Sequence, residues 1–134
     1  MAKSGTSRLT ILTNNDYSGG TVIAGGTLTL GDGTTPANGG IIGNVALDNS
    51  VLGSAVLQIN KPDALTVGGV ISGSGSLLQS GSGQTTLTAA STYVGPTIVS
   101  AGTLQLGAGG TSGSIANDIL NNGTIAFNLS LIHI

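Results

Sequence analysis

The chain has 134 residues and a formal net charge of −2, with three basic residues, five acidic ones, 24 glycines and no cysteine. Charged residues make up 6% of it, against about 25% in ordinary globular domains, and no basic cluster is present that would bind a nucleic-acid backbone. Val, Ile and Leu are frequent, unlike in disordered glycine-rich chains, and no apolar run approaches the ~18 residues of a membrane-spanning helix.

Glycine spacing excludes long helices and indicates short strands. The longest glycine-free run, residues 54–67, is interrupted by Pro62, and inside a helix glycine costs about 1 kcal/mol and proline about 3 kcal/mol relative to alanine. Leu28 and Leu30 alternate with Thr27 and Thr29, which is the two-residue period of a strand. Similar runs, bounded by Gly, Asn, Asp or Ser, occur in chain order at residues 21–23, 27–30, 56–59, 65–67, 86–88, 97–99, 103–106 and 124–127.

One stretch of the sequence is written twice. Residues 17–31 and 93–107 agree at eight of fifteen positions, and residues 3–31 align without a gap on residues 79–107 at an offset of 76. After Gly107 the offset falls to 68, and an eight-residue difference in the loop after Gly31 and after Gly107 accounts for this change. The matched pairs beyond this loop are Asn49/Asn117, Val51/Ile119, Leu52/Leu120, Leu57/Ile125 and Asn60/Asn128.

Loops of variable length between fixed strands are typical of solenoids, in which each coil stacks on the next. We therefore expect an all-β parallel β-helix with roughly 20–25 residues per coil and roughly five to six coils, stacked about 4.8 Å apart. Val22, Ile23, Leu28 and Leu30 are expected to fill the core, with the threonines of the repeat facing outward.

The repeated stretch resembles the autotransporter-associated, or passenger-associated, β-strand repeat of type V autotransporter passenger domains. That pattern has a Lys/Gln-x-Gly start, an Asn-x-Tyr-x-Gly-x-Thr turn and an Ala-Gly-Thr-Leu-x-Leu-Gly strand. The structural motif positions are Tyr17, Gly19, Thr21, Gly26, Thr27, Leu28, Leu30 and Gly31 in the first copy, and Tyr93, Gly95, Thr97, Gly102, Thr103, Leu104, Leu106 and Gly107 in the second. Pro96 and the pair Ala89-Ala90 depart from it.

The resemblance implies a right-handed parallel β-helix displayed on the surface of a Gram-negative bacterium. It also implies that the repeat aids passage through the outer membrane, and that the parent protein carries a C-terminal outer-membrane β-barrel translocator. No signal peptide is seen in this sequence.

Both ends of the sequence look cut. We expect residues 1–128 to be a β-helix fragment, uncapped at both ends, with copies at residues 3–78 and 79–128, the second incomplete. The last six residues, LSLIHI, resemble the in-frame translation of a transposase mosaic end used in sequencing libraries, and the alternative is an ordinary apolar terminal strand. A cut solenoid exposes its interior and its strand edges, so we expect the isolated fragment to associate end to end.

No catalytic, cofactor-binding or metal-binding residue is predicted. The five acidic residues fall at expected turns, where aspartate makes local hydrogen bonds, and Lys3, Arg8 and Lys61 are dispersed. The single histidine, His133, lies in the six-residue tail. Gly31-Asp32-Gly33 is one isolated fragment of a calcium-binding nonapeptide pattern. The aspartates are Asp16, Asp32, Asp48, Asp63 and Asp118.

The predicted function is structural: a β-helical stalk segment of an autotransporter passenger, with adhesin or spacer roles open for the parent. The first alternative is the scaffold of an enzymatic passenger, a protease or polysaccharide lyase, whose active site lies outside this sequence. The second is ice or glycan binding by threonine faces, although Gln105 interrupts the Thr-x-Thr pattern. No small-molecule substrate is indicated.

Overall fold

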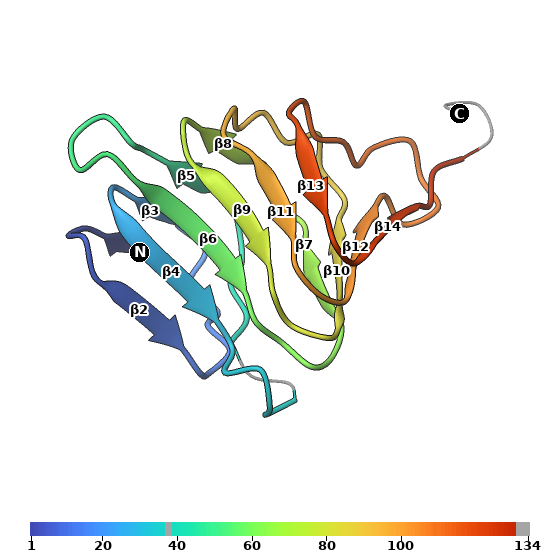
Figure 1. The fold of residues 1–134 in the computed structure, drawn as a ribbon, viewed down its shortest axis with the longest axis horizontal. Coiled ribbons are helices and arrows are strands. Elements are labelled where there is room, and N and C mark those ends of the chain that lie inside the picture. Colours follow the sequence, from blue (N-terminus) through green and yellow to red (C-terminus); the bar gives the residue numbers. More distant parts are fainter. Residues whose placement is uncertain (37–38, 131–134) are drawn as a thin grey trace.

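The computed structural model describes residues 1–36 and 39–130, which form fourteen β-strands and no helix. No helix in these residues is therefore able to cross a membrane. The strands follow one another in six coils (Figure 1). They are β1 (Ala2–Lys3) and β2 (Arg8–Ile11) in coil 1; β3 (Thr21–Ile23) and β4 (Gly26–Leu30) in coil 2; β5 (Val45–Leu47), β6 (Ala55–Ile59) and β7 (Leu65–Val67) in coil 3; β8 (Ile71–Gly73), β9 (Ser76–Gln79) and β10 (Gln84–Leu87) in coil 4; β11 (Thr97–Val99) and β12 (Thr103–Leu106) in coil 5; and β13 (Ile119–Asn121) and β14 (Thr124–Phe127) in coil 6.

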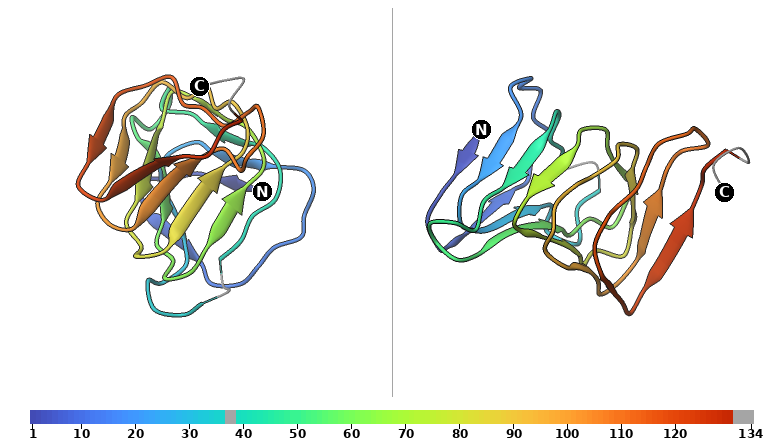
Figure 2. Two further views of the ribbon diagram at one scale, coloured as in Figure 1. Left: turned by 90° about the vertical axis from the view of Figure 1, so that its right-hand side faces the viewer. Right: turned by 90° about the horizontal axis from the view of Figure 1, so that it is seen from above.

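The strands stack into three parallel sheets, one on each side of the coil. Sheet A has the order β1-β3-β5-β8, sheet B the order β13-β11-β9-β6-β4-β2, and sheet C the order β14-β12-β10-β7. All the named strand pairs are parallel. The chain winds in right-handed coils from one end to the other, and the view along the axis shows the closed outline of the coils (Figure 2). The predicted parallel β-helix of five to six coils is confirmed.

The core is a set of inward-facing ladders in which equivalent residues of successive coils touch. In sheet B, Leu28, Leu57 and Leu77 occupy neighbouring rungs and are each 0% exposed. Burial of one such side chain stabilises the fold by about 1.5–3 kcal/mol. The same ladder ends at Leu9 and Ile119, which are 41% and 37% exposed because β2 and β13 each have only one strand neighbour among the described residues.

The two sequence copies do not occupy the same sides of the solenoid. In the first copy β3 and β4 lie in sheets A and B, whereas their equivalents β11 and β12 lie in sheets B and C. The pairs β1/β9 and β2/β10 show the same shift. Residues 12–20 form the third side of coil 1, and the described residues 31–36 and 39–44 lie on the third side of coil 2, in both cases without a strand. Strand β1 lies in sheet A of coil 1, and its equivalent β9 lies in sheet B of coil 4. The path from one to the other is therefore three full turns and one further side of the coil. Each repeat therefore turns the pattern by one face.

This shift also corrects the alignment of the later residues. By position on the coil, β5 and β6 correspond to β13 and β14, so Val45, and not Val51, is the equivalent of Ile119. Residues 32–44 number thirteen against eleven in 108–118. Val56 is the register equivalent of Thr124, so residues 48–55 number eight against two, Asn122 and Gly123. The eight-residue difference thus divides into two residues in the long loop and six at the corner between sheets A and B. A single loop change after Gly107 was the wrong interpretation.

Candidate functional site

A long polar side chain points into the coil at the start of each copy. Lys3 is 6% exposed, and its Nζ donates hydrogen bonds to the carbonyl oxygens of Ser4 (2.8 Å), Gly5 (2.8 Å) and Gly25 (3.1 Å). Gln79, at the equivalent position, is 1% exposed, and its Nε2 donates to the carbonyl oxygens of Gly81 (3.1 Å) and Gly83 (3.2 Å). Buried carbonyl groups at a corner need donors. The backbone N–H of Thr103 supplies one to the Gly83 oxygen (3.1 Å), and the Lys3 and Gln79 side chains supply the others named here. Both residues cap a corner from inside.

The two copies differ in how they satisfy this side chain. Glutamine carries an acceptor as well as donors, and Gln79 Oε1 accepts a 2.6 Å hydrogen bond from Thr85 Oγ1. Lysine carries donors alone, and the first copy has Leu9 at the position of Thr85. The residue type on the next strand therefore differs with the capping side chain: glutamine is accompanied by a threonine, which donates to it, and lysine by a leucine. Sequence reasoning noticed the Lys/Gln-x-Gly start without assigning a role to it, and it missed Thr85.

We predict that Thr85→Leu destabilises the protein, by about 1–3 kcal/mol, because it leaves Gln79 Oε1 buried without a donor. In the Gln79→Lys background the same substitution should cost much less, since this pair reproduces the first copy. Urea denaturation of the four variants in a double-mutant cycle measures the coupling. If Thr85→Leu lowers the free energy of unfolding equally in both backgrounds, residues 79 and 85 are not coupled and the explanation is wrong.

The capped corners also require glycine. Gly26 and Gly102 have φ angles of 67° and 66°, a left-handed conformation that side chains disfavour. A Cβ atom at Gly102 would overlap the carbonyl oxygens of Gly81 and Gly83, the two groups that Gln79 caps. A Cβ at Gly26 would lie 2.6 Å from the Gly5 carbonyl oxygen. The corner thus brings two backbone segments together too closely for any side chain.

The other glycines of the motif differ among themselves. Gly31 and Gly107 share a φ of 84°, and a Cβ atom would lie 2.6 Å from the carbonyl oxygens of Asn60 and Asn128, respectively. A Cβ at Gly95 would overlap the Gly75 carbonyl oxygen. Gly19 has an ordinary φ and open space around it, and nothing in the structure explains a glycine there.

Each motif tyrosine bonds a threonine four residues later. Tyr17 OH lies 2.8 Å from Thr21 Oγ1, and Tyr93 OH lies 2.5 Å from Thr97 Oγ1. In the second copy Thr97 Oγ1 donates to Asn117 Oδ1 (2.6 Å), and Asn117 Nδ2 donates to the Tyr93 carbonyl oxygen (2.9 Å). Tyr93 is 0% exposed, and its burial raises the pKa of the phenol, against the opposite effect of the hydrogen bonds with Thr97 and Asn117. This cluster fixes the loop before β11 against the next coil.

These contacts overturn the expected orientation of two motif threonines. Thr21 and Thr97 are 2% and 0% exposed, so the prediction that they face outward is wrong, and Val22, predicted for the core, is 45% exposed. The strand alternates as expected, but Thr21 shares the inward face with Ile23. A buried hydroxyl is acceptable there because the tyrosine satisfies it. Leu28, Leu30, Leu104 and Leu106 are buried, and Thr27 and Thr103 are partly exposed.

The passenger-associated-transport-repeat family matches residues 1–30 and 77–106, which contain these corners. An adhesin autotransporter, BmaC, of Brucella suis biovar 1 (strain 1330) is 36% identical over 126 residues, covering 84% of this chain. The chain belongs to the autotransporter passenger repeats. It spans 4% of the length of that adhesin. No solved structure matches the chain.

Outside the repeat motifs, the side chains of Asp32 and Asp48 hydrogen-bond within turns. The Asp32 carboxylate accepts hydrogen bonds from the backbone N–H groups of Thr35 (2.7 Å) and Thr34 (2.8 Å) and from both hydroxyls, and these bonds hold its pKa far below the usual range. Hydrogen bonds from Ser50 lower the pKa of Asp48. Asp63 pairs with Lys61 at 3.2 Å. In residues 1–36 and 39–130 no three His, Cys, Asp or Glu side chains lie together as a metal site would require.

These lowered pKa values set the expected pH dependence of this passenger repeat. A carboxylate with a depressed pKa stabilises the fold above its unfolded pKa, about 3.9, and this contribution is lost as the pH falls toward the folded-state value. Asp32→Ala should therefore lower the urea midpoint at pH 7, and the difference from wild type should shrink as the pH falls below about 3.9. Denaturation series at pH 7 and at low pH measure this. A difference that stays constant with pH would contradict the assignment.

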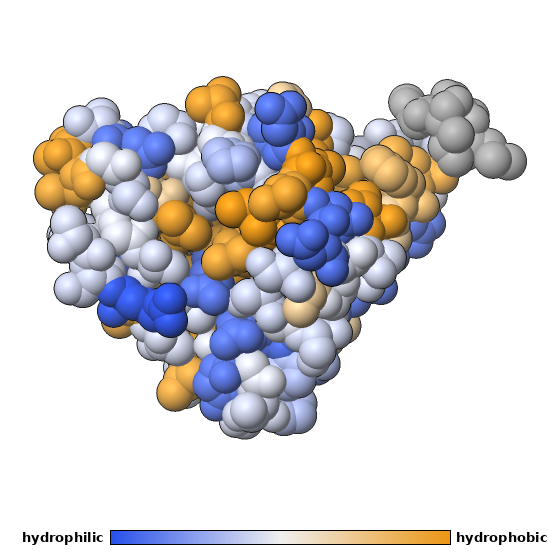
Figure 3. Space-filling view, in the orientation of Figure 1, coloured by the Kyte–Doolittle hydropathy of each residue, from blue (hydrophilic) through white to orange (hydrophobic). Residues whose placement is uncertain are grey.

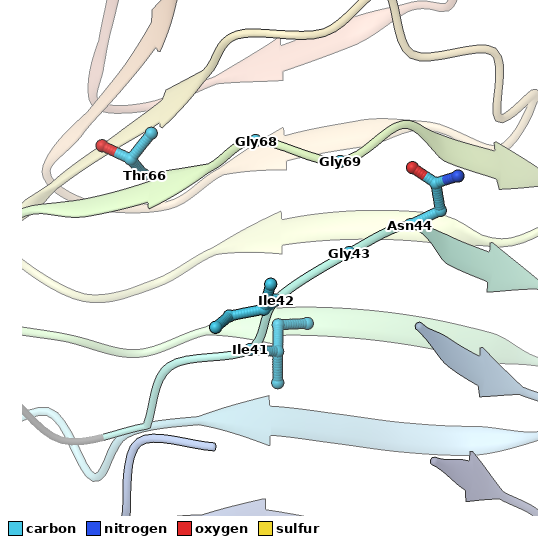
Figure 4. A pocket seen from close by; sticks show the side chains of 7 residues that line it. All are labelled: Ile41, Ile42, Gly43, Asn44, Thr66, Gly68 and Gly69. Carbon is cyan, nitrogen blue, oxygen red and sulfur yellow. The ribbon is translucent and has the colours of Figure 1, made fainter. Parts of the chain in front are cut away.

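One shallow pocket lies between coils 2 and 3 and has a volume of about 530 Å³. Figure 4 shows residues 41–44 on one side and the segment after β7 on the other. Its lining contains no titratable side chain, and one of its two isoleucines, Ile42, is 54% exposed. The pocket brings together no groups that would perform a reaction. The lining residues are Ile41, Ile42, Gly43, Asn44, Thr66, Gly68 and Gly69.

The tail predicted to be foreign lies mostly outside the described residues. Only Leu129 and Ser130 are described, and His133 is not. Leu129 lies beside Gly107, where Lys61 lies beside Gly31 in the first copy.

Proposed function

We propose that this chain is a structural stalk segment of an autotransporter passenger, displayed at the surface of a Gram-negative bacterium and aiding its own passage across the outer membrane. The observation that carries the proposal is the use of the motif's polar groups. Lys3 and Gln79 donate hydrogen bonds to backbone carbonyl groups, and the two tyrosines bond the hydroxyls of Thr21 and Thr97 in their own copies. Polar groups used in this way build the coil and are not available for a reaction.

The relative supports a link with adhesion, because it is named an adhesin. We propose that a parent protein of this chain has an adhesive rather than an enzymatic passenger, with a C-terminal β-barrel translocator. In such a protein the repeats separate the binding region from the membrane. Their contribution to secretion comes from folding into a rigid coil that needs no disulfide, consistent with the absence of cysteine.

Surface display tests this proposal. The chain is fused, behind a signal peptide, to an autotransporter translocator barrel, and the displayed fraction is measured with an antibody on intact cells. Gly102→Ala, which disrupts a corner, should reduce display several-fold, whereas Gly53→Ala, a glycine with open space around it, should leave most of it. Wild-type display of a Gly102→Ala chain that is shown to be unfolded would contradict a role of the folded repeat in secretion.

We also propose that the isolated chain associates end to end. Strands β1 and β2 at one end, and β13 and β14 at the other, each have one strand neighbour among the described residues. Phe127 belongs to the inward ladder of Leu87 and Leu106, and at the end of that ladder it is 70% exposed. Phe127→Lys should reduce the average mass in sedimentation at high concentration. An unchanged mass distribution would count against this mode.

A further inference from the structure

The corner between β13 and β14 carries an Asn-Gly pair, Asn122-Gly123, at the surface of the solenoid. Both residues and the preceding Asn121 are exposed. Figure 3 shows the corner as a hydrophilic area beside a hydrophobic patch over β9, β11 and β13. The same pair occurs once more in the sequence, at residues 38–39, of which only Gly39 is described. An asparagine that precedes glycine can be attacked at its side-chain amide by the backbone nitrogen of that glycine.

Three consecutive backbone N–H groups at this corner have different kinds of partner. The N–H groups of Asn122 and Thr124 donate to backbone carbonyl oxygens of coil 5, at 2.7 Å and 3.0 Å. Gly123 N–H instead donates to Oδ1 of the Asn121 side chain, at 3.0 Å. The nitrogen of Gly123 is therefore the one whose partner is a side chain, which a substitution can remove without changing the backbone.

We propose that Asn122 is a site of spontaneous deamidation and that Asn121 slows the reaction by holding the Gly123 N–H. The Gly123 nitrogen loses its proton to hydroxide and forms a bond with Cγ of Asn122. The bond between Cγ and Nδ2 breaks, and Nδ2 leaves as ammonia after taking a proton from water, which regenerates the hydroxide. Water then opens the succinimide ring at either of its two carbonyl carbons and leaves aspartate or isoaspartate.

Two features favour the reaction and one opposes it. Gly123 has no Cβ atom to hinder the approach to its nitrogen, and the Asn122 side chain has no hydrogen bond within residues 1–36 and 39–130 that would fix its amide. Against this, the bond to Asn121 Oδ1 stabilises the protonated form of the Gly123 nitrogen. The rate at Asn122 therefore depends on a side chain that takes no part in the bond changes.

The first copy provides a matched comparison around Asn49. Asp48 Oδ1 accepts a hydrogen bond from the N–H of Ser50, two residues later, at 2.8 Å, which is the same local turn as in the second copy. The Asn49 side chain, however, is held in place, because its Nδ2 donates to the Ser74 carbonyl oxygen at 2.7 Å. The residue after Asn49 also carries a Cβ atom. Asn49 should therefore keep its amide for longer than Asn122.

Deamidation would alter coil 6 in two ways. Either product adds a negative charge to a chain whose formal net charge is −2. Isoaspartate also lengthens the backbone between β13 and β14, because the main chain then runs through Cβ of residue 122. The N–H groups of Asn122 and Thr124 could then no longer both reach their acceptors in coil 5. The reaction would therefore loosen coil 6.

Peptide mapping by tandem mass spectrometry tests the proposal on the 134-residue chain, folded and incubated at mildly alkaline pH. In the wild type, Asn122 should deamidate several-fold faster than Asn49. Asn121→Ala should speed the reaction at Asn122 by about three- to tenfold, the factor in rate that one hydrogen bond represents. Asn121→Asp keeps an acceptor oxygen and should be no faster than the wild type. Asn121 is exposed, so these variants are expected to fold, and circular dichroism checks this.

The same mapping in concentrated urea separates the folded corner from the local sequence. Asn121→Ala should have no effect there, because the bond to Gly123 is absent from the unfolded chain. The proposal is overturned if Asn121→Ala leaves the rate at Asn122 unchanged in the folded protein, or if it speeds the reaction equally in urea. A wild-type Asn122 that is no faster than Asn49 would overturn it as well.

Discussion

Gly102→Ala should cost about 2–5 kcal/mol of unfolding free energy. A non-glycine residue in the left-handed region costs about 1–2 kcal/mol, and forcing atoms into a packed site costs about 1–3 kcal/mol more. The obstacle at Gly102 is two backbone carbonyl oxygens, those of Gly81 and Gly83, and these cannot rotate away as a side chain would. Urea denaturation followed by circular dichroism measures the loss, which is large beside a total stability of about 5–15 kcal/mol.

Alanine substitutions at two other glycines separate the backbone-conformation cost from the steric cost. Gly53 has a φ of 73° but nothing within 4 Å of a Cβ atom, so Gly53→Ala should show the backbone cost alone. Gly19 has neither a positive φ nor a close neighbour, and Gly19→Ala should be almost neutral. If Gly102→Ala costs no more than Gly53→Ala, the close approach of the two coils at this corner is wrong.

Tyr93→Ala should cost about 3–5 kcal/mol, as removal of a fully buried aromatic side chain does. Tyr93 is 0% exposed and also bonds Thr97, whereas its equivalent Tyr17 is only partly buried. Tyr17→Ala should therefore cost clearly less, although the two residues occupy the same position of the repeat. Thermal or urea denaturation of both variants tests the difference.

Tyr93→Phe isolates the hydroxyl. Thr97 Oγ1 keeps its bond to Asn117 Oδ1 in that variant, so the expected cost is about 1 kcal/mol, the typical value for one hydrogen bond. Equal losses for Tyr93→Ala and Tyr17→Ala would mean that position in the repeat, and not burial, determines the contribution of the tyrosine.

Much of the fold could be predicted from the sequence because strand alternation and glycine spacing are local properties. The leucines of residues 26–31 and 102–107 are buried as their two-residue period indicates. The internal repeat then favoured stacked coils over hairpins. Both inferences depend only on residue type and spacing along the chain.

The orientation of the polar motif residues could not be predicted in this way. A threonine on a strand is usually taken to face solvent, and Thr21 faces inward because Tyr17, four residues earlier, supplies a hydrogen-bond partner. The same holds for Lys3, a residue type that is usually exposed but whose Nζ lies among three carbonyl acceptors here. Partners of this kind depend on how the coil closes.

The rotation of the second copy by one side of the coil could not be predicted from the alignment of the two copies either. Matching residues 3–31 with 79–107 shows which residues are equivalent, but the side of the coil on which they lie depends on the sides crossed between them. Residues 12–20, and the described residues 31–36 and 39–44, cross a side without forming a strand, and no pattern in their sequence marks this.

Cross-linking of paired cysteines tests the one-face turn most directly. Thr66 and Thr86 are register neighbours on the outer side of sheet C, so Thr66→Cys with Thr86→Cys should be joined by a thiol cross-linker spanning one strand separation, about 4.8 Å. If the copies instead stacked on the same faces, β10 would follow β2 into sheet B beside β6, and Gln58→Cys with Thr86→Cys would be joined. Mass spectrometry of the digested products, with labelling of each single cysteine as a reactivity control, distinguishes the two. The structure predicts a cross-link in the first pair and none in the second, and the reverse result would contradict it.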